Sequence, residues 1–187
     1  MKELSLHLLD VAKNSVAAGA TWVDISLDED KDGRLTIVIS DNGRGMSPEF
    51  LAQVTDPFTT PRTPRKVGLG LPLYRMAAEQ TGGSLDIQST LGKGTTVTAV
   101  FHRRHLDCPP LGDLAGTVAL LIQGSPELDL HYRHTTPRGT AELSTGARRL
   151  RGILGPDISL AEPELFAWIT DYISEQEAQI QRAGGAL

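Results

Sequence analysis

A glycine-containing turn directly after a predicted strand constrains the fold of this chain most. The turn is Asp41-Asn42-Gly43-Arg44-Gly45-Met46, and it follows residues 35–39, which predict a buried strand. Gly43 and Gly45 have no side chain and can adopt positive φ, so backbone there can approach a flat ligand closely. Two more glycine clusters follow, Gly68-Leu69-Gly70 and Gly92-Lys93-Gly94-Thr95-Thr96.

Residues 3–18, upstream of that turn, predict an amphipathic helix. Its apolar side carries, at helical spacing, Leu4, Leu8, Val11, Ala12 and Ser15. Its opposite side carries His7, Asp10 and Asn14, whose spacing places them in one stripe. Gly19 is a natural end for this helix.

The remaining segments of the first half predict a sheet with connecting helices. Residues 22–27 alternate in polarity and form, with the turn at 30–33 and the strand 35–39, a predicted hairpin. Two further alternating strands are expected at 84–89 and 95–101. A short helix is predicted from Pro48 and a longer one at about 71–80, whereas the prolines within 56–67 exclude a continuous helix there.

Composition limits the class of protein. The chain has 187 residues and a formal net charge of −5, which argues against a general nucleic-acid surface. Cys108 is the only cysteine, so no intrachain disulfide can form. No apolar run approaches the roughly 20 residues that span a bilayer, and the N-terminus becomes polar too early for a signal peptide. We therefore expect a cytoplasmic protein that binds neither membrane nor nucleic acid.

Asp41 is the first candidate binding residue. An ionised carboxylate only accepts hydrogen bonds, so it favours a donor such as the exocyclic amine of adenine. In isolation, Asp-Asn-Gly is more often a type I turn in which the Asp acts as a cap. The other glycine clusters favour the binding interpretation.

Two residues of the predicted helix suggest where a metal and a base could lie. Asn14 lies in the middle of the predicted helix, where asparagine has low helix propensity. Its amide oxygen suits Mg²⁺ as a ligand. The alternative is an ordinary solvent-facing Asn. Asp10, one turn earlier, could orient water as a general base or could be an ordinary exposed carboxylate. His7 could touch phosphate but is more often a partner of its neighbours.

The cluster at 68–70 precedes a predicted helix, whose free N–H groups and dipole form an anion site. Three cations come just before it, Arg62, Arg65 and Lys66, and they could neutralise phosphates or simply be solvated. The glycines and prolines of this stretch are typical of a lid that closes over a ligand. Thr95 could bond the adenine edge or belong to a plain hairpin turn. Together these elements predict a site for ATP.

Residues 3–101 resemble the ATPase superfamily of DNA gyrase, the heat-shock 90 chaperones, histidine kinases and MutL mismatch-repair proteins. The sequence of residues 10–21 resembles the family's helix that carries the magnesium-binding asparagine, and residues 41–46 resemble its adenine-binding turn. Residues 56–60 with 68–71 resemble the lid of nitrogen-regulator-type histidine kinases, and 92–96 the last glycine box. The resemblance covers just over half of the chain.

This resemblance implies an α+β fold of the Bergerat type, a two-layer α/β sandwich with a mixed, mostly antiparallel sheet and helices on one face. It implies that ATP and Mg²⁺ lie between the helix and the lid, with Asn14 as the metal ligand. The residues expected to contact the nucleotide are Asn14, Asp41, Gly43, Gly45, Met46, Phe58, Thr59, Thr60, Arg62, Lys66, Gly68, Leu69, Gly70, Leu71 and Thr95.

The chain is expected to comprise an ATP-binding domain at 1–105, a linker at 106–111 and a C-terminal α/β extension of unknown role at 112–187. The extension predicts helices at 112–123 and 162–181 around a small hairpin, with strands at 128–134 and 140–143. His131 and His134 would face opposite sides of a strand, which is poor for a shared metal. The whole chain is similar to short stand-alone histidine-kinase-like ATP-binding proteins of anaerobic bacteria.

Three departures from the family pattern bear on activity. Hydrolytic members carry Glu at the position of Asp10, and many histidine kinases carry a cation at the position of Ala17. There is no room upstream for phosphoacceptor helices, so we do not expect a complete sensor kinase. We expect a kinase-type module that acts on an unidentified protein partner; the alternatives are an ATP hydrolase with Asp10 as base, or a non-catalytic nucleotide sensor.

Overall fold

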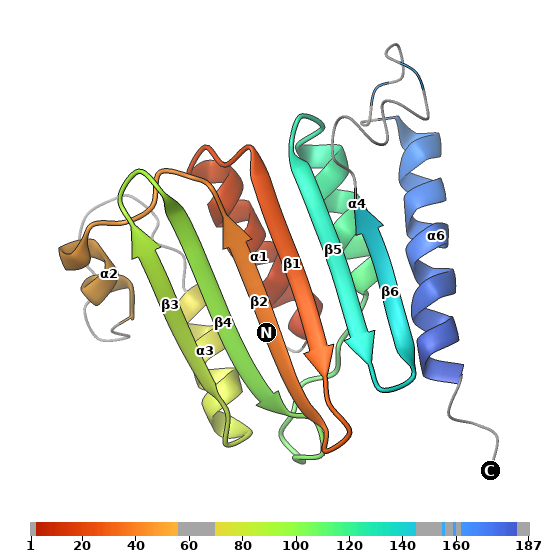
Figure 1. The fold of residues 1–187 in the computed structure, drawn as a ribbon, viewed down its shortest axis with the longest axis horizontal. Coiled ribbons are helices and arrows are strands. Elements are labelled where there is room, and N and C mark those ends of the chain that lie inside the picture. Colours follow the sequence, from red (N-terminus) through yellow and green to blue (C-terminus); the bar gives the residue numbers. More distant parts are fainter. Residues whose placement is uncertain (1–2, 56–69, 145–154, 156–158, 160–161, 183–187) are drawn as a thin grey trace.

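The fold is built on one six-stranded sheet (Figure 1). The computed structural model describes residues 3–55, 70–144, 155, 159 and 162–182. The strands are β1 (Trp22–Glu29), β2 (Arg34–Asp41), β3 (Ser84–Thr90), β4 (Gly94–His102), β5 (Asp129–Thr136) and β6 (Gly139–Ser144). Their order is β3-β4-β2-β1-β5-β6, and only the β1–β5 pair is parallel.

Helices cover one face of this sheet. They are α1 (Leu4–Ala17), α2 (Pro48–Thr55), α3 (Gly70–Gln80), α4 (Leu114–Gly124) and α6 (Pro163–Arg182). Figure 1 shows α1, α3 and α4 behind the strands and α6 beside β6, so the described elements leave the other face uncovered. This arrangement confirms the predicted mixed, mostly antiparallel sheet with helices on one face. Among the residues described, no helix is long and apolar enough to cross a bilayer.

The alternation of the strands decides which side chains enter the core. In β1, Val23, Ile25 and Leu27 are buried on the helix side, while Asp24 and Asp28 point to the uncovered face. Neighbouring strands repeat this pattern in register, because Ile25 pairs with Ile39 of β2 and Tyr132 of β5. The result is one apolar core that runs under the sheet from β3 to β6.

His7 departs from the sequence prediction. Helical spacing placed it in a polar stripe with Asp10 and Asn14, but only those two are exposed, and His7 is 1% exposed. Its ring stacks on Tyr74 of α3 with centroids 4.8 Å apart, and burial lowers the pKa of His7 to about 4. Packing between α1 and α3 therefore buries a side chain that helical spacing placed in the polar stripe, and the stacking on Tyr74 agrees with the alternative that His7 is a partner of its neighbours.

Helix α4 joins the C-terminal elements to the first half of the chain. Eight of its eleven residues are buried, as expected of a helix that has neighbours on several sides. Its N-terminus is capped by Asp113, whose Oδ1 accepts from the Gly116 N–H at 2.8 Å. Just before it, the carbonyls of Pro110 and Leu111 accept hydrogen bonds from Leu4 and Ser5 at the start of α1. The start of α1 and the entry to α4 are thereby fixed to each other.

Helix α6 is fastened to the β5–β6 hairpin by a buried polar cluster. The Tyr132 hydroxyl donates to Glu177 Oε1 at 2.6 Å, and His134 Nδ1 lies 2.9 Å from Glu177 Oε2. The side chains of His134 and Glu177 are only 2% and 10% exposed. A carboxylate buried among apolar residues is tolerated because both of its oxygens are engaged.

A second contact between α6 and β6 involves the backbone N–H and the backbone carbonyl of one residue. The N–H of Glu142 donates to Gln176 Oε1 at 3.0 Å, and its carbonyl accepts from Gln176 Nε2 at 3.1 Å. The side-chain amide thus forms the same pair of bonds that a neighbouring strand would form.

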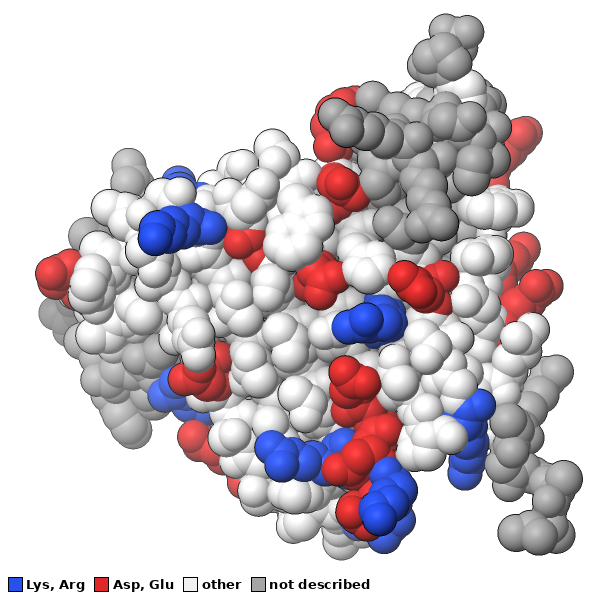
Figure 2. Space-filling model, viewed as in Figure 1, with Lys and Arg blue, Asp and Glu red and all other residues white. Residues whose placement is uncertain are grey.

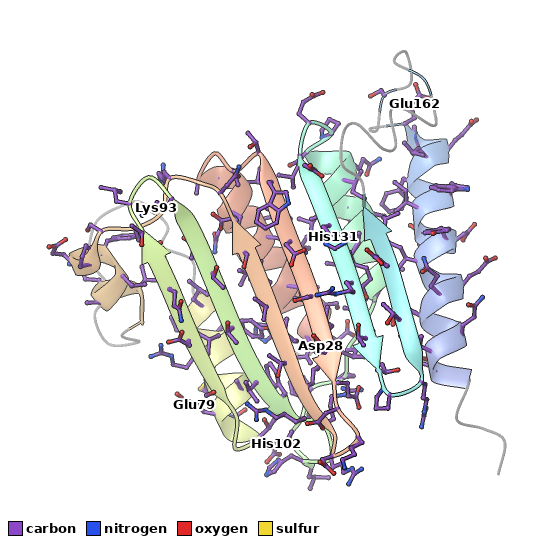
Figure 3. The ribbon with its side chains drawn as sticks, in the orientation of Figure 1. Asp28, Glu79, Lys93, His102, His131 and Glu162 are labelled. Atoms are coloured by element: carbon purple, nitrogen blue, oxygen red, sulfur yellow. The ribbon has the colours of Figure 1, made fainter. Side chains whose placement is uncertain are left out.

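His131 occupies the uncovered face at the β1–β5 junction (Figure 3), opposite to buried His134, as the strand alternation predicted. Its Nδ1 lies 2.6 Å from Asp24 Oδ1 and its Nε2 lies 2.9 Å from Glu142 Oε1. Burial favours the neutral ring, but the hydrogen bonds and charges of Glu142 and Asp24 outweigh it, so the pKa of His131 is raised. One imidazole therefore links β1, β5 and β6.

Replacing Glu177 with Ala should destabilise the protein, because His134 and Tyr132 would lose their buried partner. We expect a loss of about 3 kcal/mol in the free energy of unfolding. The matched control is Glu175→Ala on the exposed side of α6, which should change it by less than about 0.5 kcal/mol. Chemical denaturation of both variants measures the difference, and equal losses would contradict the role of Glu177.

The bridge at His131 should make stability depend on pH. Because the folded-state pKa is raised, this contribution is complete below the unfolded value near 6.5 and is lost as pH rises through the folded value. The unfolding free energy of wild type should exceed that of His131→Gln by more at pH 5.5 than at pH 8. The exposed His102→Gln serves as control, and a pH-independent difference for His131→Gln would count against the bridge.

Candidate functional site

The turn at 41–46 packs backbone against backbone at the ends of β2, β3 and β4. Gly45 has φ of 64°, and a Cβ there would overlap the carbonyl oxygen of Thr90. Gly94 has φ of 113°, and a Cβ there would overlap the carbonyl oxygen of Asp41. Both glycines are therefore required for this close approach as well as for their backbone conformation.

Backbone hydrogen bonds fix the turn on two sides. The N–H of Arg44 donates to the carbonyl of Ala18 at 3.0 Å, just after α1. The carbonyl of Arg44 accepts from the Gly92 N–H at 2.7 Å, and the Met46 N–H donates to Ser89 Oγ at 2.9 Å. The turn is thus held between the end of α1 and the β3–β4 turn, where Figure 3 shows Lys93.

Asn42 anchors the same turn to the start of β1, a role that the sequence analysis missed. Its Oδ1 accepts from the N–H groups of Thr21 and Trp22, each at 2.9 Å, and its Nδ2 donates to Thr21 Oγ1 at 2.9 Å. The signal available in the sequence was an Asn between an acid and a glycine, which usually bonds its own turn. Here the bonds go to a distant segment.

Asp41 presents its carboxylate on the helix side of β2. Oδ1 accepts from the N–H groups of Gly43 at 2.9 Å and Thr95 at 3.2 Å. Oδ2 accepts from the Ser15 hydroxyl at 2.6 Å. A carboxylate has about four acceptor positions, so Oδ2 retains capacity for one more donor. The three bonds fix the direction in which that position points.

Ser15 is the second functional residue that sequence reasoning missed. It was assigned to the apolar side of the helix, and it is indeed 4% exposed. A buried hydroxyl needs a partner, and this one bonds Asp41, which lies next to α1. A serine in an otherwise apolar stripe was the available signal.

Thr95 lies opposite Asp41 in the β2–β4 pairing. Its hydroxyl is 2.9 Å from Ser89 Oγ, which also bonds the carbonyl of Gly94 at 3.0 Å. Ser89 thereby joins Thr95, which donates its N–H to Asp41, to Met46. The structure thus brings the turn at 41–46 together with the glycine cluster at 92–96.

The polar side of α1 leads away from Asp41 towards the start of α3. Asp10 and Asn14 are exposed, and one helical turn, about 6 Å of axis, separates them. Gly70 begins α3 beside Asp10, since a Cβ at Gly70 would lie 3.3 Å from Asp10 Oδ2. Leu71, the next residue, packs against the core. Asp41 therefore contacts α1 at Ser15, and Gly70 lies beside Asp10, with Asn14 between these two positions of the helix in sequence.

The other residues predicted for the site belong to the segment 56–69, which lies outside the described residues. They are Phe58, Thr59, Thr60, Arg62, Lys66, Gly68 and Leu69.

A hollow of about 210 Å³ opens at the end of the sheet. It is lined by Asp41, Gln88, Ser89, Thr90, Lys93, Gly94, Thr95 and Thr96. Gln88 and Thr96 pair with each other on the uncovered face, whereas Asp41 and Thr95 pair with each other on the helix side. The hollow is smaller than the roughly 300 Å³ of typical small-molecule sites, so it can be only part of one.

Comparison with known proteins assigns residues 2–105 to a family. The family model described as histidine kinase-, DNA gyrase B- and HSP90-like ATPase matches residues 2–105. The sensor protein SrrB of Staphylococcus aureus is 39% identical over 101 residues, which are 51% of this chain and 17% of that protein. The chain therefore spans about a sixth of the length of this curated relative.

Two solved structures are similar to this chain. The crystal structure of the N-terminal domain of a DNA repair protein has a TM-score of 0.50 and 18% identity, covering 78% of this chain and 53% of that one. The Aquifex aeolicus MutL ATPase domain complexed with ADP has a TM-score of 0.49 and 15% identity, covering 82% and 68%. From the family match over more than half of its length, the chain belongs to the histidine kinase-, DNA gyrase B- and HSP90-like ATPases.

Proposed function

We propose that this chain binds ATP with Mg²⁺ along α1 and acts as a kinase-type or regulatory module on a protein partner. The observation that carries the proposal is the carboxylate of Asp41. Three hydrogen bonds orient it, and Oδ2 retains an acceptor position on the helix side of the sheet. Membership of the histidine kinase-, DNA gyrase B- and HSP90-like ATPases supports the nucleotide and the kinase type. The similarity to a sensor protein supports a regulatory role.

The arrangement at Asp41 suits adenine for two reasons. The remaining acceptor position matches the exocyclic amine, which donates. Gly43 lies against the carboxylate, and a Cβ there would come 3.1 Å from Asp41 Oδ1 and 3.0 Å from the Ala18 Cβ. A side chain at this position would crowd the edge where a flat base must approach.

The phosphates would lie further along α1, by Asn14, Asp10 and Gly70. Asn14 would supply one oxygen to Mg²⁺, which usually keeps several waters and shares its remaining positions with phosphate oxygens. The first N–H groups of α3, which begins at Gly70, carry the positive end of a helix dipole and favour the anion. Arg62 and Lys66 are proposed to complete this neutralisation from the lid segment.

When bound, ATP supplies the transferable phosphoryl group, and the protein's contribution is positioning and charge stabilisation. Asp41 would hold one end of the nucleotide and Asn14 the metal, with Asp10 one turn of α1 away from Asn14. An acceptor side chain on a partner protein would approach at the phosphate end of the nucleotide. The partner is proposed from the kinase type alone.

Hydrolysis is the second candidate, and the position of Asp10 favours it. This carboxylate is exposed and lies beside the N-terminus of α3, where the terminal phosphate is expected. It could accept a proton from an attacking water.

Binding of ATP should depend on the acceptor at Asp41. In Asp41→Asn the amide oxygen can keep the hydrogen bonds from the N–H groups of Gly43 and Thr95. The NH₂ group would replace Oδ2 and face the exocyclic amine of adenine, so two hydrogen-bond donors would oppose each other. We expect affinity to fall by about tenfold to hundredfold with the fold retained. Calorimetry with ATP measures this, and Asp86→Asn on the uncovered face is the matched control.

Asn14→Ala extends the same calorimetry to the metal. Wild type should bind ATP more tightly with Mg²⁺ than without it, and Asn14→Ala should lose most of that difference. If Asp41→Asn, Asn14→Ala and wild type bind alike under both conditions, the proposed site is wrong.

Turnover separates the two candidate functions. If Asp10 is the base for hydrolysis, Asp10→Asn should lower the rate of ATP hydrolysis by at least about a hundredfold while ATP affinity stays within about twofold. Asp10→Glu, which matches the length found in hydrolytic members, should keep or raise the rate. Glu79→Gln at the other end of α3 is the control. An unchanged rate in Asp10→Asn would remove Asp10 from the reaction.

A further inference from the structure

The two sides of α6 have different chemistry. The side that faces β6 and α4 buries Leu165, Ile169, Ile173 and Ile180, together with Glu177. The opposite side is exposed and carries, at helical spacing, Glu164, Trp168, Asp171, Tyr172 and Glu175. We call this second set the outer face of α6. In Figure 1, no described helix or strand lies beyond it.

An aromatic pair dominates the outer face. Trp168 and Tyr172 are one turn apart, and their rings stack with centroids 5.3 Å apart and an interplanar angle of 14°. Trp168 is 47% exposed and Tyr172 39%. Packing of α6 onto the sheet does not require them, because the buried side already supplies its apolar contacts. Large aromatic side chains that remain exposed on a helix are typical of interaction surfaces.

The charged residues that α6 itself places around this pair are all acidic. Glu164 precedes Trp168 by one turn, Asp171 lies beside Tyr172, and Glu175 follows at the next turn. Within α6 the sequence has no Lys or Arg before Arg182. Figure 2 shows Asp and Glu side chains along this edge of the molecule. An aromatic platform among carboxylates attracts guanidinium groups, which stack on rings and bond carboxylates at the same time.

We propose that the outer face of α6 binds an arginine-rich segment of a partner protein, with arginine side chains on the Trp168–Tyr172 pair and in contact with the flanking carboxylates. A second copy of this chain fits less well, because two such faces would bring like charges together. Helix α6 lies at the β6 edge of the sheet, and strands β1 and β5 separate β6 from β2, which carries Asp41. Binding at the outer face of α6 therefore leaves the nucleotide contacts in place.

The test uses the full chain and two fluorescein-labelled peptides, one of eight arginines and one of eight lysines. Fluorescence anisotropy should show tighter binding of the arginine peptide, because lysine lacks the planar group that stacks. The double variant Trp168→Ala/Tyr172→Ala should lose about tenfold in affinity for the arginine peptide and less for the lysine peptide. Its ATP affinity should match that of wild type, which separates this proposal from the nucleotide site.

A charge control distinguishes a specific face from general attraction. Glu164→Gln/Asp171→Asn/Glu175→Gln should weaken binding of the arginine peptide by about tenfold or more, whereas Asp28→Asn/Glu79→Gln/Asp86→Asn removes the same charge elsewhere and should change it less than twofold. Equal losses in the two triple variants would overturn the proposal. So would a concentration-dependent dimer in sedimentation that disappears in Trp168→Ala/Tyr172→Ala, because a second copy would then be the occupant.

Discussion

The close approach of two backbone turns at the end of β2 is the constraint on which the candidate site depends. Gly45 lies against the carbonyl of Thr90, and Gly94 lies against the carbonyl of Asp41. No side chain fits at either contact, so the spacing of the turns is fixed by backbone alone. This spacing sets the Asp41 carboxylate within reach of the Thr95 N–H and the Ser15 hydroxyl. The direction of one acceptor thus follows from two glycines.

Helix α1 is shared between the site and the C-terminal elements. One side carries Asp10 and Asn14, and the other packs into the core that includes α4. Its first two N–H groups bond the segment that leads into α4. Packed interiors transmit displacement rather than absorb it, so α1 supports both the site and the β5–β6 hairpin. The parallel β1–β5 pair continues the same sheet across the two halves.

Much of this architecture could be predicted from local pattern, and the rest depends on contacts between distant segments. Alternation identified the strands, and helical spacing identified α1, α4 and α6 within a few residues. The pattern could not place β5 beside β1, because alternation shows which face of a strand is buried but not which strand lies next to it. It misassigned His7 because stacking on Tyr74 is a tertiary contact. At the site, the glycines and Asp41 were recognisable, whereas Ser15 and Asn42 act through partners that only the fold brings near.

One edge strand of the sheet, β6, has backbone groups that a side chain occupies. On β6, the side-chain amide of Gln176 hydrogen-bonds to both the backbone N–H and the backbone carbonyl of Glu142. An edge strand with unpaired backbone N–H and carbonyl groups is a template for other strands. A side chain that hydrogen-bonds to these groups therefore discourages edge-to-edge pairing of sheets between molecules. A single glutamine on α6 thereby contributes to keeping the protein from aggregating as well as to holding the helix in place.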